Sequence, residues 1–506
     1  MSSSQEGEPD PVAGRRMLLH PFVSSRPGCG GSPPMLPSRL PTRRAVLAGL
    51  GSLSVAAAFP SAGAAVADDT AAPMPEGFVW GVAASAPQTE SADGRGDSVW
   101  DVFARRPGAI RDGSDLRVTT AFERLYATDI GLVADAGVRA FRFSFAWSRL
   151  QPDGRRRPDA AGLDLYDRIL DAMLARGLTP WATALHWDVP AALGDWRSRD
   201  VAFRYADYAS ILAARFGDRI RQWIVLNEPN VVALFGYGYG DHAPGLRDRD
   251  AVLAAIHHQN LAQGLGFQAL RASLPAARRV GTTLSLQPAR PAGAAAADAE
   301  AAVALDALWN GAFLQPLFGR LYPESLQTAL EPWMQPGDAR IIAAAPDFLG
   351  VNYYSPLYAV ADPGHPLGVR VVEAPAGLER TGVGWPVEPE GLSEMLLRVK
   401  QDYGDPEMVI TEFGASYADP PPRGGTIADP QRTDFLRRHL LAVRAAIAEG
   451  CRVTGAFAWS ATDNWEWEKG FTAPFGLIGI DRQTLQRTPK QSLVWLGACA
   501  QANVVL

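Results

Sequence analysis

Short apolar runs rich in branched and aromatic residues alternate along most of the chain with longer amphipathic stretches. The short runs have the length of buried strands, whereas the longer stretches repeat apolar residues at helical spacing. Strands are predicted at Phe78–Ala84, Val138–Phe143, Thr179–Leu185, Gln222–Leu226, Val280–Leu284, Phe348–Val351, Met408–Thr411 and Thr454–Ala458. Helices are predicted between them at Thr120–Ala136, Leu163–Arg176, Ala202–Phe216, Ala251–Ser273, Gly391–Asp402 and Thr433–Glu449.

This alternation favours the α/β class and a single (β/α)8 TIM barrel, in which each strand is followed by a helix. A doubly wound parallel sheet is the alternative, because periodicity alone does not show that a sheet closes. The Pro- and Gly-rich segment Pro420–Gly425 and the stretch Ala359–Trp385 are predicted to be long loops that follow late strands. Loops at that end of a barrel carry its active site.

The first 67 residues differ in composition from the rest of the chain. Arg43 and Arg44 precede an uncharged apolar run that ends near Phe59, and Ala65-Val66-Ala67 then forms a small-residue cleavage site. A charged start, an apolar middle and a small-residue end are typical of a signal peptide, and the paired arginines resemble a twin-arginine export signal. The apolar run is shorter than the roughly 20 residues of a membrane-spanning helix, although an uncleaved anchor is the alternative.

We therefore expect residues 1–67 to be a cleaved leader and residues 68–506 to be one barrel domain, secreted or exported without a stable membrane anchor. The leader carries six Arg and three acidic residues, so the net charge of −6 for the whole chain becomes −9 for residues 68–506. This acidic balance argues against a nucleic-acid partner. Cys451 and Cys499 lie in the barrel domain, where either a disulfide or two buried free thiols fit the sequence.

Polar and aromatic residues gather directly after the predicted strands. They are Gln88 after the first strand, His186-Trp187 after the third, Asn227-Glu228 after the fourth, Glu412 after the seventh, and Trp459, Glu466 and Trp467 after the eighth. Because the C-terminal ends of barrel strands meet at one face, we expect these side chains to form one pocket.

Two carboxyl groups on opposite walls of such a pocket, those of Glu228 and Glu412, suit the cleavage of a glycosidic bond. One of them, kept protonated by its surroundings, donates a proton to the leaving oxygen, while the other attacks the anomeric carbon. Nearby amide, imidazole and carboxyl groups can pair with sugar hydroxyls. Trp187, Trp459 and Trp467 can cover the apolar face of a sugar while their indole N–H groups form hydrogen bonds.

The motifs at these positions resemble those of glycoside hydrolase family 1, the retaining β-glucosidases, from Phe78-Val79-Trp80-Gly81 to about Trp495. Asn227-Glu228-Pro229 matches the acid/base motif of that family, and Thr411-Glu412-Phe413-Gly414 matches its nucleophile motif. The resemblance implies that Glu228 is the acid and base and Glu412 the nucleophile, with no metal and no cofactor.

The same resemblance implies roles for further residues. The implied ligands of the glycone hydroxyls are Gln88, His186, Asn227, Glu466 and Trp467, with Trp459 as the platform beneath the sugar. Arg142, Asn352 and Tyr354 are implied to hold and tune the nucleophile, and Trp385 is implied to line the aglycone side.

Some positions depart from the family pattern. Phe413 stands where the family usually has Asn, Ser91 where it usually has Gly, Pro386 replaces a common acid, and Ala473-Pro474 replaces a basic residue. These departures leave the two central carboxylates intact and bear on substrate preference. Glu466 argues against a phospho-sugar substrate, because its charge would repel a phosphate near the 6-position of the sugar.

The resulting expectation is a retaining β-glucosidase that hydrolyses terminal non-reducing β-D-glucosyl residues of a β-glycoside or oligosaccharide. A transglycosidase, or a β-galactosidase or β-fucosidase, on the same scaffold is the alternative among enzymes. A non-catalytic carbohydrate-binding relative is the alternative outside that class. Retention requires the two carboxyl groups to lie about 5–5.5 Å apart.

Overall fold

Eight parallel strands close into a barrel in the computed structural model, which describes residues 73–155 and 157–506. The strands are β1 (Val79–Ala83), β2 (Ala140–Ser144), β3 (Thr179–Leu185), β4 (Gln222–Asn227), β5 (Arg279–Ser285), β7 (Leu349–Asn352), β10 (Met408–Phe413) and β11 (Val453–Trp459). They follow one another around the barrel in chain order, and β11 pairs in parallel with β1. The (β/α)8 barrel is confirmed, and the doubly wound sheet is excluded because the sheet has no open edge.

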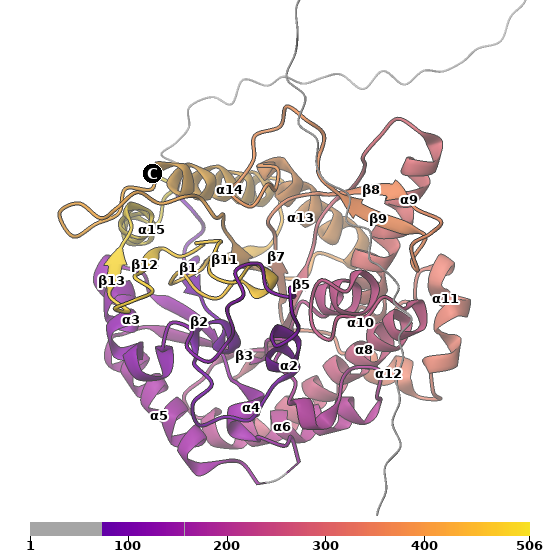
Figure 1. Ribbon diagram of the computed structural model, residues 1–506, viewed down its shortest axis with the longest axis horizontal. Helices are drawn as coiled ribbons and strands as arrows, with labels where there is room; N and C mark the ends of the chain where they lie inside the picture. Colours follow the sequence, from indigo (N-terminus) through magenta and orange to yellow (C-terminus); the bar gives the residue numbers. More distant parts are fainter. Residues whose placement is uncertain (1–72, 156) are drawn as a thin grey trace, which may run out of the picture. The chain divides into compact units, whose positions relative to one another are not determined.

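A ring of helices surrounds the strands (Figure 1). It consists of α3 (Phe122–Ala136), α5 (Ala160–Ala175), α6 (Asp200–Phe216), α8 (Arg249–Ser273), α13 (Pro389–Tyr403) and α14 (Pro430–Ala448), which match the six predicted helices. Each helix turns an apolar stripe inward. On α6, for example, Tyr205, Leu212 and Phe216 are fully buried and lie on one helical face.

The segment between β5 and β7 contains four helices that were not predicted, namely α9 (Ala296–Asp306), α10 (Ala312–Leu317), α11 (Glu324–Leu330) and α12 (Asp338–Ile342). Alanine occupies most of α9, so its buried face is not marked by larger apolar residues. Pro316 lies inside α10, where proline ordinarily signals a helix end. For these two reasons the sequence of α9 and α10 lacks a clear helical pattern of apolar residues.

The stretch Ala359–Trp385, predicted to be a loop, takes part in a small sheet. This sheet is formed by β6 (Ala289–Pro291), β8 (Leu357–Ala361) and β9 (Val369–Val372). The turn residues Pro363, Gly364 and Gly368 lie between β8 and β9 and make the segment look irregular, although the two strands pair in antiparallel register. The prediction was therefore wrong for this part, whereas Pro420–Gly425 contains no helix or strand.

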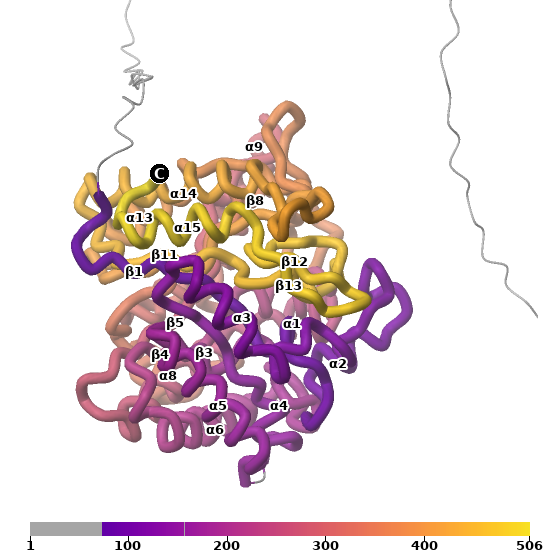
Figure 2. The backbone as a smooth tube through the Cα atoms, turned by 90° about the vertical axis from the view of Figure 1, so that its left-hand side faces the viewer, coloured from indigo at the N-terminus to yellow at the C-terminus, as the bar shows by residue number. Residues whose placement is uncertain are grey.

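Short elements extend the loops that follow the strands, and several lie toward the right of Figure 2. They are α1 (Ala86–Thr89), α2 (Val99–Ala104), α4 (Trp147–Leu150), α7 (Pro229–Val231), the π-helical segments Val232–Tyr239 and Ala307–Gly311, the hairpin of β12 (Ile478–Ile480) and β13 (Arg487–Pro489), and short 3₁₀ turns at Ala191–Leu193, Glu331–Trp333 and Trp467–Lys469. The last helix, α15 (Gln491–Ala502), packs on α3 and α14.

Aromatic rings fill the interior of the barrel below these loops. Trp181 on β3 meets Phe348 and Phe457 edge to face, with ring centroids 5.3 and 5.0 Å apart. Gly81 on β1, the strand beside β11, makes room for the Phe457 ring, because a Cβ there would lie 2.3 Å from it. The barrel is thus a packed core with a closed floor under the site.

Two further predictions concern the leader and the cysteines. The predicted leader lies outside the described residues, so its role and its boundary at residue 67 stay predictions. In the described part of the chain, none of the helices has the length and apolar character needed to span a bilayer. Cys451 and Cys499 are both buried and free, which selects the thiol alternative over the disulfide.

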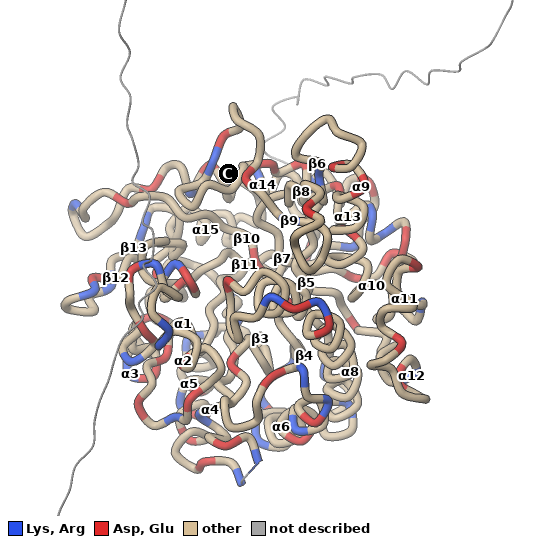
Figure 3. The backbone as a smooth tube through the Cα atoms, turned by 45° about the vertical axis from the view of Figure 1, so that its right-hand side comes forward, with Lys and Arg blue, Asp and Glu red and all other residues tan. Residues whose placement is uncertain are grey.

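Figure 3 shows Lys and Arg interspersed with Asp and Glu along the outer helices and loops.

A buried ion-pair network joins the loops that follow β10 and β11. Arg432 Nη1 on α14 lies 2.6 Å from Asp429 and 2.9 Å from Asp419. Lys490 Nζ, between β13 and α15, lies 2.6 Å from Asp419 and 2.7 Å from Asp463. Both cationic side chains are fully buried, so their charges depend on these acids for compensation.

Replacing Lys490 with Met is expected to lower the free energy of unfolding by about 3–5 kcal/mol, because Asp463 and Asp419 would lose their buried cation. Urea denaturation at neutral pH measures the change. Lys400→Met is the matched control, since the Lys400 ammonium is partly exposed and donates only to the Glu449 carbonyl. That variant should stay within about 0.5 kcal/mol of the parent. Equal stability of the two variants would contradict a stabilising role for the network.

Candidate active site

A cavity of about 360 Å³ opens at the C-terminal ends of the barrel strands. Its volume lies in the range typical of small-molecule sites. Nine of the residues predicted for the site line it, namely His186, Trp187, Glu228, Tyr354, Trp385, Glu412, Trp459, Glu466 and Trp467. The other four, Gln88, Arg142, Asn227 and Asn352, lie behind this lining and reach it through hydrogen bonds.

Glu412, at the end of β10, is held at both carboxylate oxygens. Its Oε1 forms an ion pair with Nη1 of Arg142, a fully buried residue of β2, and its Oε2 accepts a hydrogen bond of 2.8 Å from the Tyr354 hydroxyl. Burial and the adjacent Glu412 carboxylate raise the pKa of Tyr354 well above its ordinary value, so the phenol keeps its proton. Both partners therefore stabilise negative charge on Glu412.

Glu228 follows β4 and begins the short helix α7 in a left-handed conformation, with φ of 45°. Its backbone N–H donates to the Thr283 carbonyl at 2.9 Å, which ties this turn to β5. Burial, together with the negative charge of Glu412, raises the pKa of Glu228 to about 8. At neutral pH one carboxyl group of the pair thus carries a proton while its neighbour is stabilised as an anion, the asymmetry that acid and nucleophile roles need.

Asn227 links the two carboxyl groups from behind. Its side-chain oxygen accepts from Arg142 Nη2 at 2.6 Å and from Asn352 Nδ2 at 3.1 Å. Its amide nitrogen donates to Glu228 Oε2 at 3.2 Å and lies 3.1 Å from His186 Nε2. These four contacts use the full hydrogen-bonding capacity of the amide. Asn227 is therefore bonded directly to Glu228 and connected to Glu412 through Arg142.

His186 and Trp187, after β3, form part of the wall of the cavity. Burial, and to a lesser extent the charge of Arg142, lowers the pKa of His186 well below its ordinary value, so the imidazole is neutral. Trp187 stacks on Trp467 with ring centroids 4.4 Å apart. Its indole N–H donates to the Asn227 carbonyl at 2.9 Å.

Glu466, in the loop after β11, is supported by Gln88. The Gln88 amide donates to Glu466 Oε2 at 3.1 Å and to Asn464 at 3.2 Å, while its oxygen accepts from Ser85 at 2.6 Å. Gln88 is fully buried and lies behind Glu466. Burial raises the pKa of Glu466 to about 8, an effect that Lys469 opposes and Glu468 reinforces. A neutral carboxyl group can donate to and accept from sugar hydroxyls.

Three residues of the site have positive φ angles. The φ angles are 76° for Trp187, 45° for Glu228 and 51° for Trp467. Such conformations are costly for residues other than glycine, and they tend to gather at functional sites. Trp187 and Glu228 lie close to the ends of β3 and β4, whereas Trp467 lies farther along the loop after β11, and all three side chains line the cavity.

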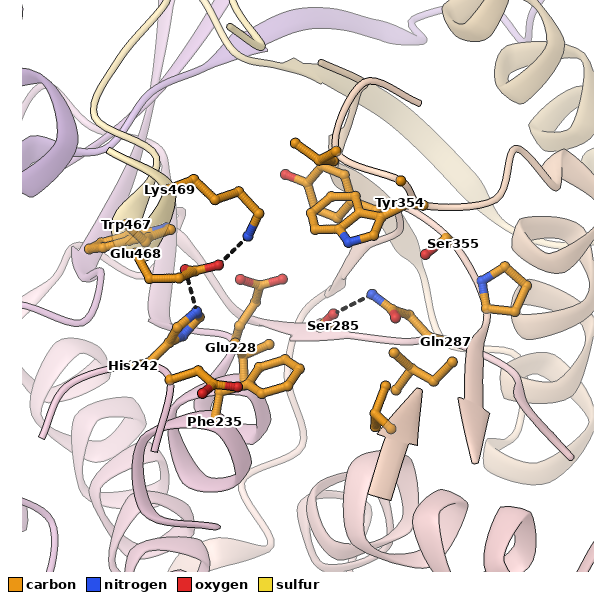
Figure 4. A pocket seen from close by; sticks show the side chains of 18 of the residues that line it. Glu228, Phe235, His242, Ser285, Gln287, Tyr354, Ser355, Trp467, Glu468 and Lys469 are labelled. Carbon is orange, nitrogen blue, oxygen red and sulfur yellow. Dashed lines mark hydrogen bonds and ion pairs between the residues drawn. The ribbon is translucent and has the colours of Figure 1, made fainter. Parts of the chain in front are cut away.

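Sequence reasoning assigned no role to several further cavity residues, among them His242, Glu468 and Lys469. The Glu468 carboxylate pairs with the Lys469 ammonium, and its other oxygen lies 3.0 Å from His242 Nε2. Figure 4 shows this chain of contacts on one side of Glu228 and the bond between Gln287 and Ser285 on the other. The sequence offered one indication of these roles. Glu468 and Lys469 are charged and directly follow Glu466-Trp467, in a loop already assigned to the site.

The sequence matches glycosyl hydrolase family 1 over residues 70–505. A β-glucosidase from Agrobacterium sp. is 39% identical over 443 residues, which cover 85% of this chain and 96% of that protein. A bifunctional β-D-glucosidase/β-D-fucosidase from Bifidobacterium breve is 37% identical, with 83% of this chain and 97% of that protein covered. A solved structure of Thermotoga maritima β-glucosidase in complex with deoxynojirimycin has a TM-score of 0.81 at 36% identity, covering 86% of this chain and all of that one.

These matches agree with the geometry of the site and with the motifs in the sequence. The family match begins before β1 and extends beyond α15, so it includes every strand of the barrel. Each relative is covered over more than nine tenths of its own length. The protein is therefore a glycosidase, and the chain belongs to glycosyl hydrolase family 1.

Proposed function

We propose that the protein is a retaining β-glucosidase that releases glucose from the non-reducing end of a β-glycoside, with Glu412 as nucleophile and Glu228 as acid and base. One observation carries this proposal, namely the different environments of the two carboxyl groups. Glu228 is protonated at neutral pH through burial and the charge of Glu412, whereas Arg142 and Tyr354 hold Glu412. β-Glucosidases among the relatives support the choice of glucose.

In the first step the Glu412 carboxylate attacks the anomeric carbon from the face opposite the leaving group. A bond forms between that carbon and a Glu412 oxygen, the glycosidic bond breaks, and the proton of Glu228 passes to the departing oxygen. The aglycone leaves as a neutral alcohol. Burial still raises the pKa of Glu228 in the intermediate, but the ester on Glu412 carries no charge, so the added repulsion disappears. The pKa of Glu228 therefore falls, which favours the carboxylate left by the proton transfer.

In the second step Glu228 acts as the base. A water molecule attacks the anomeric carbon from the face that the aglycone vacated and gives its proton to the Glu228 carboxylate. Two inversions at one carbon give net retention. Arg142 and Tyr354 then receive the restored Glu412 carboxylate, which favours its departure from the sugar. An alcohol in place of water would give the transglycosylation product from the same groups.

A β-fucosidase activity is the second candidate. The Bifidobacterium breve relative is a bifunctional β-D-glucosidase/β-D-fucosidase that aligns over nearly its whole length. The same pair of carboxyl groups would serve both sugars. Aryl β-glucoside and aryl β-fucoside assayed side by side separate the two activities.

Glu412→Ala is expected to reduce aryl β-glucoside turnover by on the order of 10⁴-fold or more, because no group remains to form the covalent intermediate. Added azide should restore part of the activity and give a glucosyl azide of inverted, α configuration, detected by NMR. Wild-type-like turnover would remove Glu412 from this role. Binding of β-glycosides by the parent protein without turnover would instead indicate the non-catalytic alternative.

The value of kcat/KM is expected to fall as the pH rises through about 8, because Glu228 must carry its proton in the free enzyme. Glu466 has a similarly raised pKa, so a variant must separate the two groups. The variant Glu228→Gln can be assayed with dinitrophenyl β-glucoside, because dinitrophenolate leaves without receiving a proton. The alkaline fall should vanish in this variant, and its persistence would assign the titration to Glu466.

We also propose that the protein is exported through the twin-arginine route. The support is the sequence around Arg43 and Arg44, the apolar run that follows and the small residues Ala65-Val66-Ala67. Replacing both arginines with lysine is expected to keep active enzyme inside the cell, as measured by fractionated β-glucosidase activity. N-terminal sequencing of exported protein should begin at Asp68. Unchanged export of the double variant would contradict the proposed route.

A further inference from the structure

One wall of the cavity carries charged groups that the proposed catalytic steps do not use. The Glu468–Lys469 pair lies in the 3₁₀ turn directly after Glu466, and both side chains line the cavity. Lys469 is 15% exposed and Glu468 25% exposed, so the pair is largely withdrawn from solvent. Figure 4 shows the Glu468 carboxylate between the Lys469 ammonium and the His242 ring, beside Glu228.

The charge of the pair is fixed by its neighbours. Burial opposes ionisation of Glu468, yet Lys469 and His242 hold the pKa of its carboxyl group well below the ordinary value. Lys469 in turn lies above the Trp385 ring, with the ammonium 5.6 Å from the ring centroid. The wall therefore presents a carboxylate, an ammonium and an aromatic face within one short stretch.

The balance of charge in the cavity limits what this wall accepts. Among the described residues that line the cavity, Lys469 is the single Lys or Arg, and it is already paired with Glu468. Six acidic residues share the lining, namely Glu228, Asp241, Glu373, Glu412, Glu466 and Glu468. Glu228 and Glu466 keep their protons at neutral pH because their pKa values are raised to about 8, yet the remaining acids still outnumber the single ammonium. An anionic leaving group would therefore meet net negative charge, so the cavity favours a neutral one.

A neutral ring with hydroxyl groups on its rim fits the wall best. Hydroxyls can accept from the Lys469 ammonium and donate to the Glu468 carboxylate, while an apolar C–H face can lie on Trp385. On the opposite side, Gln287 and Ser285 offer further polar atoms, joined to each other at 3.1 Å (Figure 4). An unsubstituted aryl group would displace water from the charged pair and return no hydrogen bond.

We propose that the Glu468–Lys469 pair is a specificity determinant for the leaving group, binding the hydroxyls of a second sugar. This inference rests on the proposed β-glucosidase function and adds the residues that select a sugar over an aryl leaving group. Glu468 and Lys469 act in binding, and Glu228 remains the proton donor for every substrate.

Lys469→Met and Glu468→Gln test the proposal with three substrates, namely cellobiose, phenyl β-glucoside and 4-nitrophenyl β-glucoside. Phenol, like a sugar, needs a proton from the enzyme to leave, but it carries no further hydroxyl groups. Nitrophenol is more acidic and leaves with little proton donation. For both variants kcat/KM on cellobiose is expected to fall about 10- to 100-fold, the range for a lost hydrogen bond to a charged group. On the two aryl glucosides it should change by less than about threefold.

Other patterns overturn the proposal. An equal loss on cellobiose and phenyl β-glucoside would mean that the pair acts on proton donation by Glu228. An equal loss on all three substrates would mean that it supports the glucose site through Glu466, and no loss on cellobiose would exclude any selective role. Lys400→Met, a lysine outside the cavity, is the control and should match the parent on each substrate. Failure of the proposed function is distinct, because the parent would then not cleave 4-nitrophenyl β-glucoside.

Discussion

Repulsion between the carboxyl groups of Glu228 and Glu412 is the interaction around which the site is arranged. Two buried acids that sense each other cannot both ionise at neutral pH, and their surroundings decide which one keeps the proton. Of the two acids, only Glu412 is bonded to Arg142 and Tyr354, so the charge settles there and the proton stays on Glu228. Asn227 touches both sides of this division, because it accepts from Arg142 and donates to Glu228. Removing the charge from either acid changes the protonation of the other.

Much of this arrangement could be predicted from the sequence. Barrel strands are short and buried, and polar residues directly after them have little reason to occur except at a site; Glu228, Glu412 and His186 were found in this way. The finer roles could not be predicted. The Trp187 N–H donates to the Asn227 carbonyl, and Gln88 lies behind Glu466. Contacts between neighbouring loops determine the direction of each of these polar groups. The sequence-based argument against phospho-sugars assumed a charged Glu466, whereas burial raises its pKa to about 8. Burial of a single carboxyl group is not visible in a linear pattern.

The loops that carry the site depend on contacts far from the reacting atoms. Gly414 follows β10 two residues after Glu412, and a Cβ there would lie 2.0 Å from the Trp459 carbonyl, so only glycine lets the ends of β10 and β11 approach. Farther out, Arg432 and Lys490 hold these same two loops together through Asp419 and Asp463. The relative placement of Glu412 and the Trp459–Trp467 loop is thus set by one close backbone contact and one ionic contact.

The aromatic floor of the barrel also restricts how a long substrate is degraded. Trp181, Phe348 and Phe457 close the space beneath the carboxyl pair, so a polysaccharide cannot thread through the barrel. In the attack at the non-reducing end proposed above, the residue removed is the one that reaches the bottom of the cavity. Glucose set free there leaves by the opening through which the substrate came, and it can do so only after the rest of the chain has moved away. The packing of the barrel thus imposes the same order of product release, remainder first and monosaccharide last, as the two chemical steps.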